Sequence, residues 1–309
     1  MRSKRQCTGR KIPVAQPAGI CYNRNREVRE SVVVRMELTF EEKKERVKDF
    51  RPIDDVFFEA LAAEPGVCEE ILRTIMEDPG LKVLEVVTQA SERNIYGRSV
   101  RLDALCTLGS GKKVNIEVQR ADNDDHFRRA RFNASAITVK NTNPGERFEE
   151  VLDLYIIYIT EHDFIKERKT TYHIDKVIRE TGTVIDDGLE EIFVNTEIFD
   201  GTDIAELMEC FKQTSVSNPK FPAMIEAVKN LKETEGGTST MCDIMQRYMS
   251  KERAQGRAEG RAEGRSEGIS KMAAQMATNL RGYGLTEAQI AELVRKSSED
   301  AEAAAATAQ

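Results

Sequence analysis

The stretch Val100–Gln119, VRLDALCTLGSGKKVNIEVQ, decides the fold of this chain. Apolar and polar residues alternate on both sides of a Gly-Ser-Gly turn, a pattern typical of an antiparallel β-hairpin. Directly opposed residues of such a pair share a face. Burying both apolar sets together therefore predicts that Ala104 pairs with Ile116 and Cys106 with Val114. This register implies an odd loop, formed by the Gly-Ser-Gly turn.

The same register brings two acidic residues together on the other face of the hairpin. Asp103 lies across from Glu117, and Arg101 lies across from Gln119. Opposed Cβ atoms are about 5 Å apart, so both carboxylates are within reach of one cation. Bare carboxylates this close repel each other, and a hard divalent cation, Mg²⁺ or Mn²⁺, relieves the repulsion. Alternatively, both acids are polar residues of a solvated face, paired with Arg101 and Lys113.

A divalent cation at these acids would suit one kind of chemistry. An ion held by two carboxylates, a backbone carbonyl and waters lowers the pKa of a bound water and stabilises charge that develops on a phosphate. Phosphodiester hydrolysis fits that combination.

Strand and helix patterns alternate around the hairpin and predict an α/β domain over residues 36–240. The run at 151–160 is continuously apolar, which favours a central strand covered on both faces. Helical patterns occur at residues 39–49, 52–62, 69–77, 122–138, 204–211 and 221–233, and further strand patterns at 81–88, 151–160, 171–178 and 191–195.

Composition bounds the class of protein. The chain has 309 residues, of which 40% are hydrophobic and 32% charged, as in globular proteins. Its net charge of -7 argues against a surface that coats nucleic acid everywhere, so any DNA contact should be a local basic patch. The six cysteines show no C-x-x-C spacing, which indicates neither a zinc site nor a disulfide framework. No stretch has the pattern of a signal peptide or membrane span, so we expect a cytoplasmic protein.

Residues 1–35 form a basic leader. They contain nine Lys and Arg against two Glu, a net charge of +7, which leaves -14 on the remainder. The segment has few apolar residues and is expected to be disordered. It is either an arm that contacts DNA or a dispensable extension, with Met36 as the start of the patterned sequence.

The C-terminal segment, residues 241–309, has a different character. Residues 253–268 repeat every four positions as R-A-Q-G-R-A-E-G-R-A-E-G-R-S-E-G, so Arg, Glu and Gly each form a slowly drifting stripe on a helix. Each glycine costs about 1 kcal/mol of helix propensity. The segment is either a solvated charged helix or a small-residue face through which a homo-oligomer packs.

Several segments resemble the PD-(D/E)XK nuclease superfamily. The runs D-A-L-C and N-I-E-V-Q resemble its D…E-x-K core. The segments R-P-I-D-D-V-F-F (51–58) and A-D-N-D-D-H-F-R-R-A-R-F-N-A-S (121–135), with the R-x-E-G tail, resemble bacterial recombination-promoting nucleases of the Rpn type, also called PD-(D/E)XK family transposases. The likeness spans about residues 45–268. It implies a restriction-endonuclease-like core, with a central mixed β-sheet flanked by helices, that cleaves DNA with Mg²⁺.

The resemblance also implies roles for individual residues. Asp103 and Glu117 correspond to the metal ligands, and position 119 to the residue that orients or activates the attacking water. Gln119 stands where the motif has Lys, and an amide cannot supply positive charge. Arg101, across from Gln119, is the expected substitute, because strand alternation points Arg120 to the opposite face.

Two further groups are candidates. Asp54 and Asp55 begin a helix, and an acid from the first helix often completes the metal site in this superfamily; Asp54 is preferred. The helix dipole alone also favours acids there. In the helix after the hairpin, Arg128, Arg131 and Ser135 share a face that suits contact with DNA phosphates. A solvated helix face is the alternative.

The expected function is therefore a Mg²⁺-dependent DNA endonuclease associated with recombination or mobile elements. One alternative is a protein of the same fold with weakened catalysis that binds DNA or a partner. Another is a structural oligomer organised by the C-terminal repeat.

Overall fold

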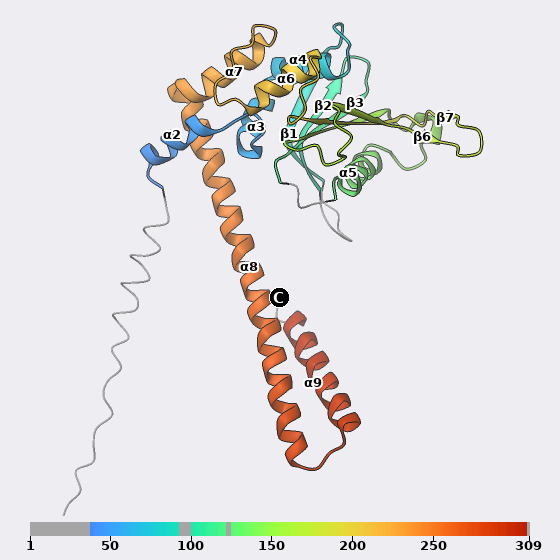
Figure 1. The fold of residues 1–309 in the computed structure, drawn as a ribbon, viewed down its shortest axis with the longest axis vertical. Coiled ribbons are helices and arrows are strands. Elements are labelled where there is room, and N and C mark those ends of the chain that lie inside the picture. Colours follow the sequence, from blue (N-terminus) through green and yellow to red (C-terminus); the bar gives the residue numbers. More distant parts are fainter. Residues whose placement is uncertain (1–37, 93–99, 122–124, 308–309) are drawn as a thin grey trace, which may run out of the picture. The chain divides into compact units, whose positions relative to one another are not determined.

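The computed structural model describes residues 38–92, 100–121 and 125–307 (Figure 1), and the predicted leader lies outside these ranges. The chain divides after Lys43, and the larger of its two units, which begins at Lys44, contains the sheet. The helices are α2 (Phe40–Asp49), α3 (Asp55–Ala62), α4 (Pro65–Ile75), α5 (His126–Lys140), the 3-10 helix η1 (Phe148–Glu150), α6 (Asp203–Lys212), α7 (Pro222–Glu233), α8 (Glu235–Gly282) and α9 (Glu287–Thr307). The strands are β1 (Val83–Glu92), β2 (Val100–Leu108), β3 (Lys113–Gln119), β4 (Leu154–Thr160), β5 (Thr171–Ile174), β6 (Lys176–Val177), β7 (Val184–Ile185) and β8 (Leu189–Asn195).

The hairpin of β2 and β3 has the predicted register. Ala104 pairs with Ile116 and Cys106 with Val114 in an antiparallel ladder. The Gly-Ser-Gly loop closes the hairpin, and Gly111 there has a φ of 85°, a left-handed conformation that glycine adopts without a Cβ clash. The alternation of apolar and polar residues therefore determines which residues oppose each other.

The hairpin belongs to a mixed six-stranded sheet of order β1-β2-β3-β4-β8-β5. Strands β3, β4 and β8 run parallel, whereas β1, β2 and β5 pair with their neighbours antiparallel. Helix α5 connects β3 to β4, because parallel neighbours need a crossover connection. As predicted, β4 is a central strand, and its residues from Ile156 to Thr160 are buried. Strands β6 and β7 form a separate two-stranded ribbon.

Helices cover both faces of the sheet, so the core forms two layers (Figure 1). In the first layer, α3, α4, α6, α7 and the start of α8 pack on the face that carries Ala104 and Ile116. In the second layer, α5 packs on the other face through Ala130, Ala134 and Ile137. The predicted fold class, an α/β core with a mixed sheet between helices and a C-terminal helical segment, is confirmed.

The end of β2 departs from the predicted pattern. Strict alternation along β2 would place Leu102 on the same face as Ala104, but Leu102 packs in the layer of α5. β2 stays paired with β1 as far as Val100, whereas its ladder with β3 ends at Ala104. The end of β2 therefore follows β1 and leaves β3. This separation opens the hairpin at the level of Asp103 and Glu117.

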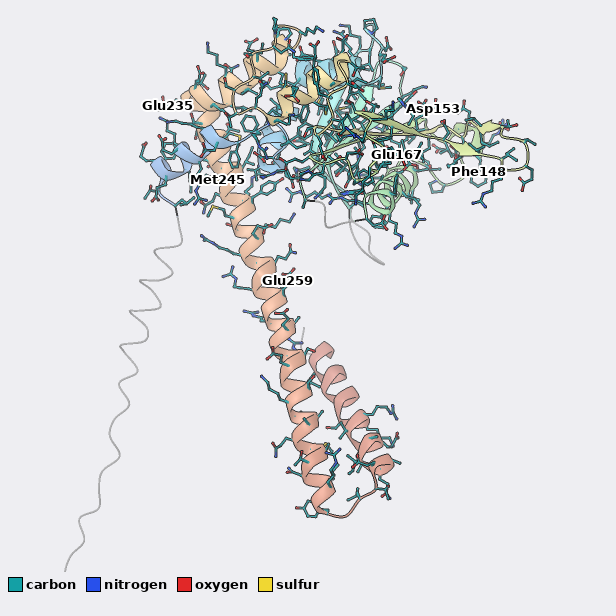
Figure 2. All side chains as sticks on the ribbon, in the orientation of Figure 1. Phe148, Asp153, Glu167, Glu235, Met245 and Glu259 are labelled. Atoms are coloured by element: carbon teal, nitrogen blue, oxygen red, sulfur yellow. The ribbon has the colours of Figure 1, made fainter. Side chains whose placement is uncertain are left out.

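Helix α8 begins in the core and continues as an exposed helix. Residues 254–268 are exposed, and α9 packs back against α8 further along (Figure 1). Figure 2 shows Met245 on the end of α8 that is buried and Glu259 on the exposed stretch. Within the described ranges, none of the helices combines the length and apolar character needed to cross a bilayer. The core residues of α8 are Met241, Cys242, Ile244 and Met245, together with Thr238.

Candidate active site

Where β2 and β3 separate, backbone amides donate hydrogen bonds to side-chain carboxylates instead of to backbone carbonyls of the opposite strand. The amide of Val118 donates a hydrogen bond to Asp103 Oδ2 at 3.1 Å, and the amide of Asp103 donates to Glu117 Oε1 at 3.4 Å. Each carboxylate thus reaches across to the other strand. Asp103 and Glu117, called here the carboxylate pair, lie together as the register predicts.

Glu117 of the carboxylate pair is buried, and Asp103 is half-buried. Glu117 is 1% exposed, and its Oε2 is buried without a hydrogen-bond partner. Burial raises the pKa of Glu117 to about 7, although Arg129 and Asn115 act in the opposite direction. Burial and the negative charge of Glu117 raise the pKa of Asp103 well above its ordinary value. Both carboxyls therefore favour a nearby positive charge, a proton or a cation.

Arg129 of α5 links Glu117 to Gln119. Its Nη1 donates to Gln119 Oε1 at 2.8 Å, and its Nη2 lies 3.7 Å from Glu117 Oε2. Gln119 in turn donates from Nε2 to the carbonyl of Ala121 at 3.3 Å. The amide of Gln119 is therefore held at both ends beside the carboxylate pair.

Arg129 is a site residue that the sequence did not reveal. In the sequence, helical spacing places Arg128, Arg131 and Ser135 on one side of the helix. In the structure, the buried side of α5 carries Ala130, Asn133 and Ile137. Arg129 precedes Asn133 by four residues and therefore lies on the side of the helix that turns toward the sheet. That spacing was the signal in the sequence.

The acids at the start of α3 separate into two environments. Asp54 accepts the amide of Arg51 at 2.7 Å and pairs with Arg120 at 2.8 Å, so the structure does not bring it to the carboxylate pair. Asp55 is exposed, yet its negative charge raises the pKa of both Asp103 and Glu117. Of the two, Asp55 is the acid that acts electrostatically on the pair, although Asp54 was preferred from the sequence.

Arg101 does not pair with Gln119, because the ladder of β2 and β3 stops before it. Its guanidinium carbon lies 5.9 Å from the ring centroid of Tyr248 on α8. The Tyr248 hydroxyl accepts a hydrogen bond from Gln89 at 3.2 Å. Burial and the charge of Asp103 raise the pKa of Tyr248. Helix α8 thus contributes a wall near the carboxylate pair, and Arg101 packs on that wall.

Arg128 and Arg131 lie on an exposed side of α5, as predicted. Together with Ser135 they line a groove of about 640 Å³. Lys176 also lines this groove, and Arg128 pairs with Asp125 at 3.2 Å. The groove therefore joins cations from α5 and from the β6–β7 ribbon.

The donors at the carboxylate pair fit a hard divalent cation. Glu117 Oε2 is a buried oxygen that lacks a hydrogen bond, and Asp103 supplies a second carboxylate. Over the described part of the chain, no three His, Cys, Asp or Glu side chains gather closely enough to hold a metal by themselves. A hard divalent cation is often bound through one or two protein carboxylates, with waters as its other ligands.

The model of the PD-(D/E)XK nuclease family transposases matches residues 70–251, more than half of the chain. The chain belongs to this family. Comparisons with curated proteins and with solved structures gave no match. The predicted family is confirmed.

Membership in the PD-(D/E)XK nuclease family transposases gives the chain a function related to nucleases or transposases. The match contains the carboxylate pair, Gln119 and Arg129, and it ends within α8 at residue 251. Asp54 and Asp55 precede it. The part of the chain that the family model describes thus includes the hairpin, α5 and the first turns of α8.

Proposed function

We propose that this protein is a Mg²⁺-dependent DNA endonuclease that hydrolyses phosphodiester bonds in recombination or mobile-element biology, in the cytoplasm. The observation that carries the proposal is the carboxylate pair, with its buried Glu117 oxygen that lacks a hydrogen bond, at the separated end of a hairpin in a chain of this family. Mn²⁺ has the same preference for oxygen ligands and is expected to replace Mg²⁺.

In this proposal Asp103 and Glu117 hold the cation. A divalent cation bound there would stabilise the negative charge that develops on the phosphate during hydrolysis and would lower the pKa of a bound water. Asn115 donates to Glu117 Oε1 at 3.1 Å and so keeps the carboxylate oriented while Oε2 faces the site. Gln119 orients the attacking water by hydrogen bonding. Arg101, packed on Tyr248, contributes positive potential at the wall of the site.

Asp54 is not needed as a ligand in this arrangement, since Arg51 and Arg120 already occupy its carboxylate. If an acid of α3 completes the ligand set through water, Asp55 is the better candidate, because its charge acts on the carboxylate pair. Replacement of each by Asn separates the two: Asp55→Asn should weaken Mn²⁺ binding more than Asp54→Asn.

We propose that Arg128 and Arg131 hold the DNA backbone. Both line the same groove as Lys176, and arginine forms bidentate contacts with phosphate. Loss of a phosphate contact should weaken binding to all sequences similarly and reduce the salt dependence of binding. Arg128→Gln and Arg131→Gln are therefore expected to raise the apparent Kd for DNA, measured at two salt concentrations.

The direct test is cleavage of supercoiled plasmid by the purified chain with Mg²⁺, Mn²⁺ or EDTA. Wild type should nick plasmid only with a divalent cation, and Asp103→Asn and Glu117→Gln should each abolish nicking. Glu149→Gln, which changes an exposed acid on η1, serves as the matched control and should keep wild-type activity. Equal nicking by wild type and both site variants would show a contaminant and remove the enzymatic proposal.

A second function has one observation in its favour. Gln119 stands where the superfamily motif has Lys, and a neutral amide lacks the charge and the titration of an amine. A protein of this fold that binds DNA or a partner without cleaving it would show DNA binding that survives Asp103→Asn, together with no nicking under any metal condition.

We propose the division into a basic leader (1–35), a nuclease-like domain (36–240) and a charged helical tail (241–309), with the refinement that the first turn of the tail is part of the core. The glycine stripe of residues 256–268 meets no other atom within 4 Å of its would-be Cβ positions, so a second copy has room to pack there. Light scattering of wild type and of a chain that ends at residue 252 tests this homo-oligomer.

A further inference from the structure

The site lacks a positively charged side chain at position 119. Gln119 is neutral, and yet phosphodiester hydrolysis builds negative charge that a preorganised cation stabilises. Other arginines near the hairpin are engaged elsewhere: Arg120 pairs with Asp54 and Glu161, and Arg101 lies over Tyr248. The positive charge at this position must therefore come from another element.

Arg129 lies where that charge is missing. Its guanidinium binds the side-chain oxygen of Gln119 at 2.8 Å and stands 3.7 Å from Glu117 Oε2. The planar guanidinium is always charged and contacts two partners at once without leaving its plane. Helix α5 starts only three residues earlier, and its N-cap Asp125 accepts the amide of Arg128, so the backbone that carries Arg129 is fixed.

The electrostatic reach of Arg129 covers the whole site. Its charge lowers the pKa of Glu117, of Asp103 and of Asp55, against the burial that raises all three. A guanidinium that acts on three carboxyls and also holds Gln119 has the position of a site cation. A surface arginine paired with one acid would not have this combination.

We propose that Arg129 is a positioning residue that supplies, from α5, the positive charge absent at position 119 and fixes the orientation of the Gln119 amide. In this arrangement Gln119 provides the hydrogen bond and Arg129 provides the positive charge, whereas a lysine at position 119 would provide both. The inference rests on the proposed nuclease function, and it predicts that a lysine at position 119 makes Arg129 dispensable.

The test compares Arg129→Gln, Arg129→Lys and the double variant Gln119→Lys/Arg129→Gln in single-turnover plasmid nicking. Removing one preorganised group from a charge-stabilising site typically costs about a hundredfold in rate. For Arg129→Gln we expect this loss in the single-turnover rate constant at saturating protein, with the protein concentration that gives half the maximal rate little changed. Arg129→Lys should keep part of the rate. The double variant should recover at least about tenfold over Arg129→Gln. Arg147→Gln, at the exposed N-cap of η1, is the control for loss of any arginine.

Mn²⁺ titration provides a readout that does not depend on turnover. Removing a positive charge beside the carboxylate pair leaves the pair more attractive to a cation, so Arg129→Gln should bind Mn²⁺ as tightly as wild type or more tightly. Parallel loss of Mn²⁺ affinity and activity would show that Arg129 only maintains the fold, and would overturn the inference.

The remaining outcomes separate the two proposals. If wild type nicks plasmid and Arg129→Gln nicks equally well, or if lysine at position 119 gives no recovery, the inference about Arg129 is wrong while the nuclease function stands. If wild type does not nick plasmid with any divalent cation, the proposed function fails, and the inference fails with it.

Discussion

Replacing Glu117 by Gln should stabilise the metal-free protein above neutral pH. The pKa of Glu117 is about 7 in the folded chain, against an ordinary value of 4.5, because burial disfavours the charged form. Between these pH values the folded state keeps a proton that the unfolded chain has released. The contribution of Glu117 to stability is therefore full below about pH 4.5 and is lost as pH rises through about 7.

The size of the effect follows from the same two values. Each pKa unit corresponds to about 1.4 kcal/mol. The difference between the ordinary pKa of 4.5 and the folded-state pKa of about 7 therefore amounts to about 3 kcal/mol of unfolding free energy. Glu117→Gln removes the buried charge and keeps an oxygen that accepts from Asn115 and from the amide of Asp103. The pKa of about 7 already includes the attraction to Arg129, so a net gain of about 3 kcal/mol at pH 8 and little change at pH 5 are expected.

Urea unfolding of both proteins in EDTA, followed by circular dichroism at pH 5 and pH 8, measures this difference. Glu69→Gln is a control of opposite sign, because the amide of Val83 and the ammonium of Lys82 hold the pKa of Glu69 below its ordinary value. That variant should lose stability at pH 8. A stability difference between Glu117→Gln and wild type that is equal at the two pH values would refute the reasoning. Added Mn²⁺ should stabilise wild type at pH 8 and leave Glu117→Gln unaffected.

Three further predictions concern α8. Gly237→Ala should destabilise the fold, because the added Cβ would overlap a backbone carbonyl of α7, whereas Gly256→Ala meets open space and should stabilise the helix by about 1 kcal/mol; thermal unfolding of the two variants should shift in opposite directions. A chain that ends at residue 240 lacks four buried side chains of α8 and should not fold, whereas one that ends at residue 252 should unfold cooperatively near the wild-type urea midpoint; similar midpoints for both would contradict this assignment. Tyr248→Phe loses the hydrogen bond from Gln89 and should cost about 1 kcal/mol by urea unfolding, and no loss would mean that this hydrogen bond contributes nothing to stability.

The register of the hairpin was predictable because burial of a period-two pattern permits only one alignment. The positions of Ala104 and Ile116 follow from that alignment alone, and so does the meeting of Asp103 with Glu117. The face on which Leu102 is buried was not predictable in the same way. It depends on β2 staying paired with β1 beyond Ala104, where its pairing with β3 ends. Local alternation carries no information about which neighbour a strand follows.

The surroundings of the carboxylate pair were harder to predict. The phase of α5 against the sheet is set by small residues, Ala130 and Ala134, and by the buried amide of Asn133, which together give a weak apolar stripe. The sequence therefore did not distinguish Arg129 from Arg128. Asp54 and Asp55 are adjacent, and only the tertiary contact with Arg120 decides between them.

The crossed hydrogen bonds at the open end of the hairpin make one backbone group sensitive to what binds there. The amide proton of Val118 is protected by the carboxylate of Asp103, 3.1 Å away. A cation that draws this carboxylate toward itself removes the acceptor and leaves the proton available to solvent. Deuterium uptake at this single amide should therefore become faster when a cation is bound. The backbone amides in the paired part of the hairpin, from Ala104 to Thr107 on β2, should stay protected. Exchange at Val118 would then report whether the site is occupied.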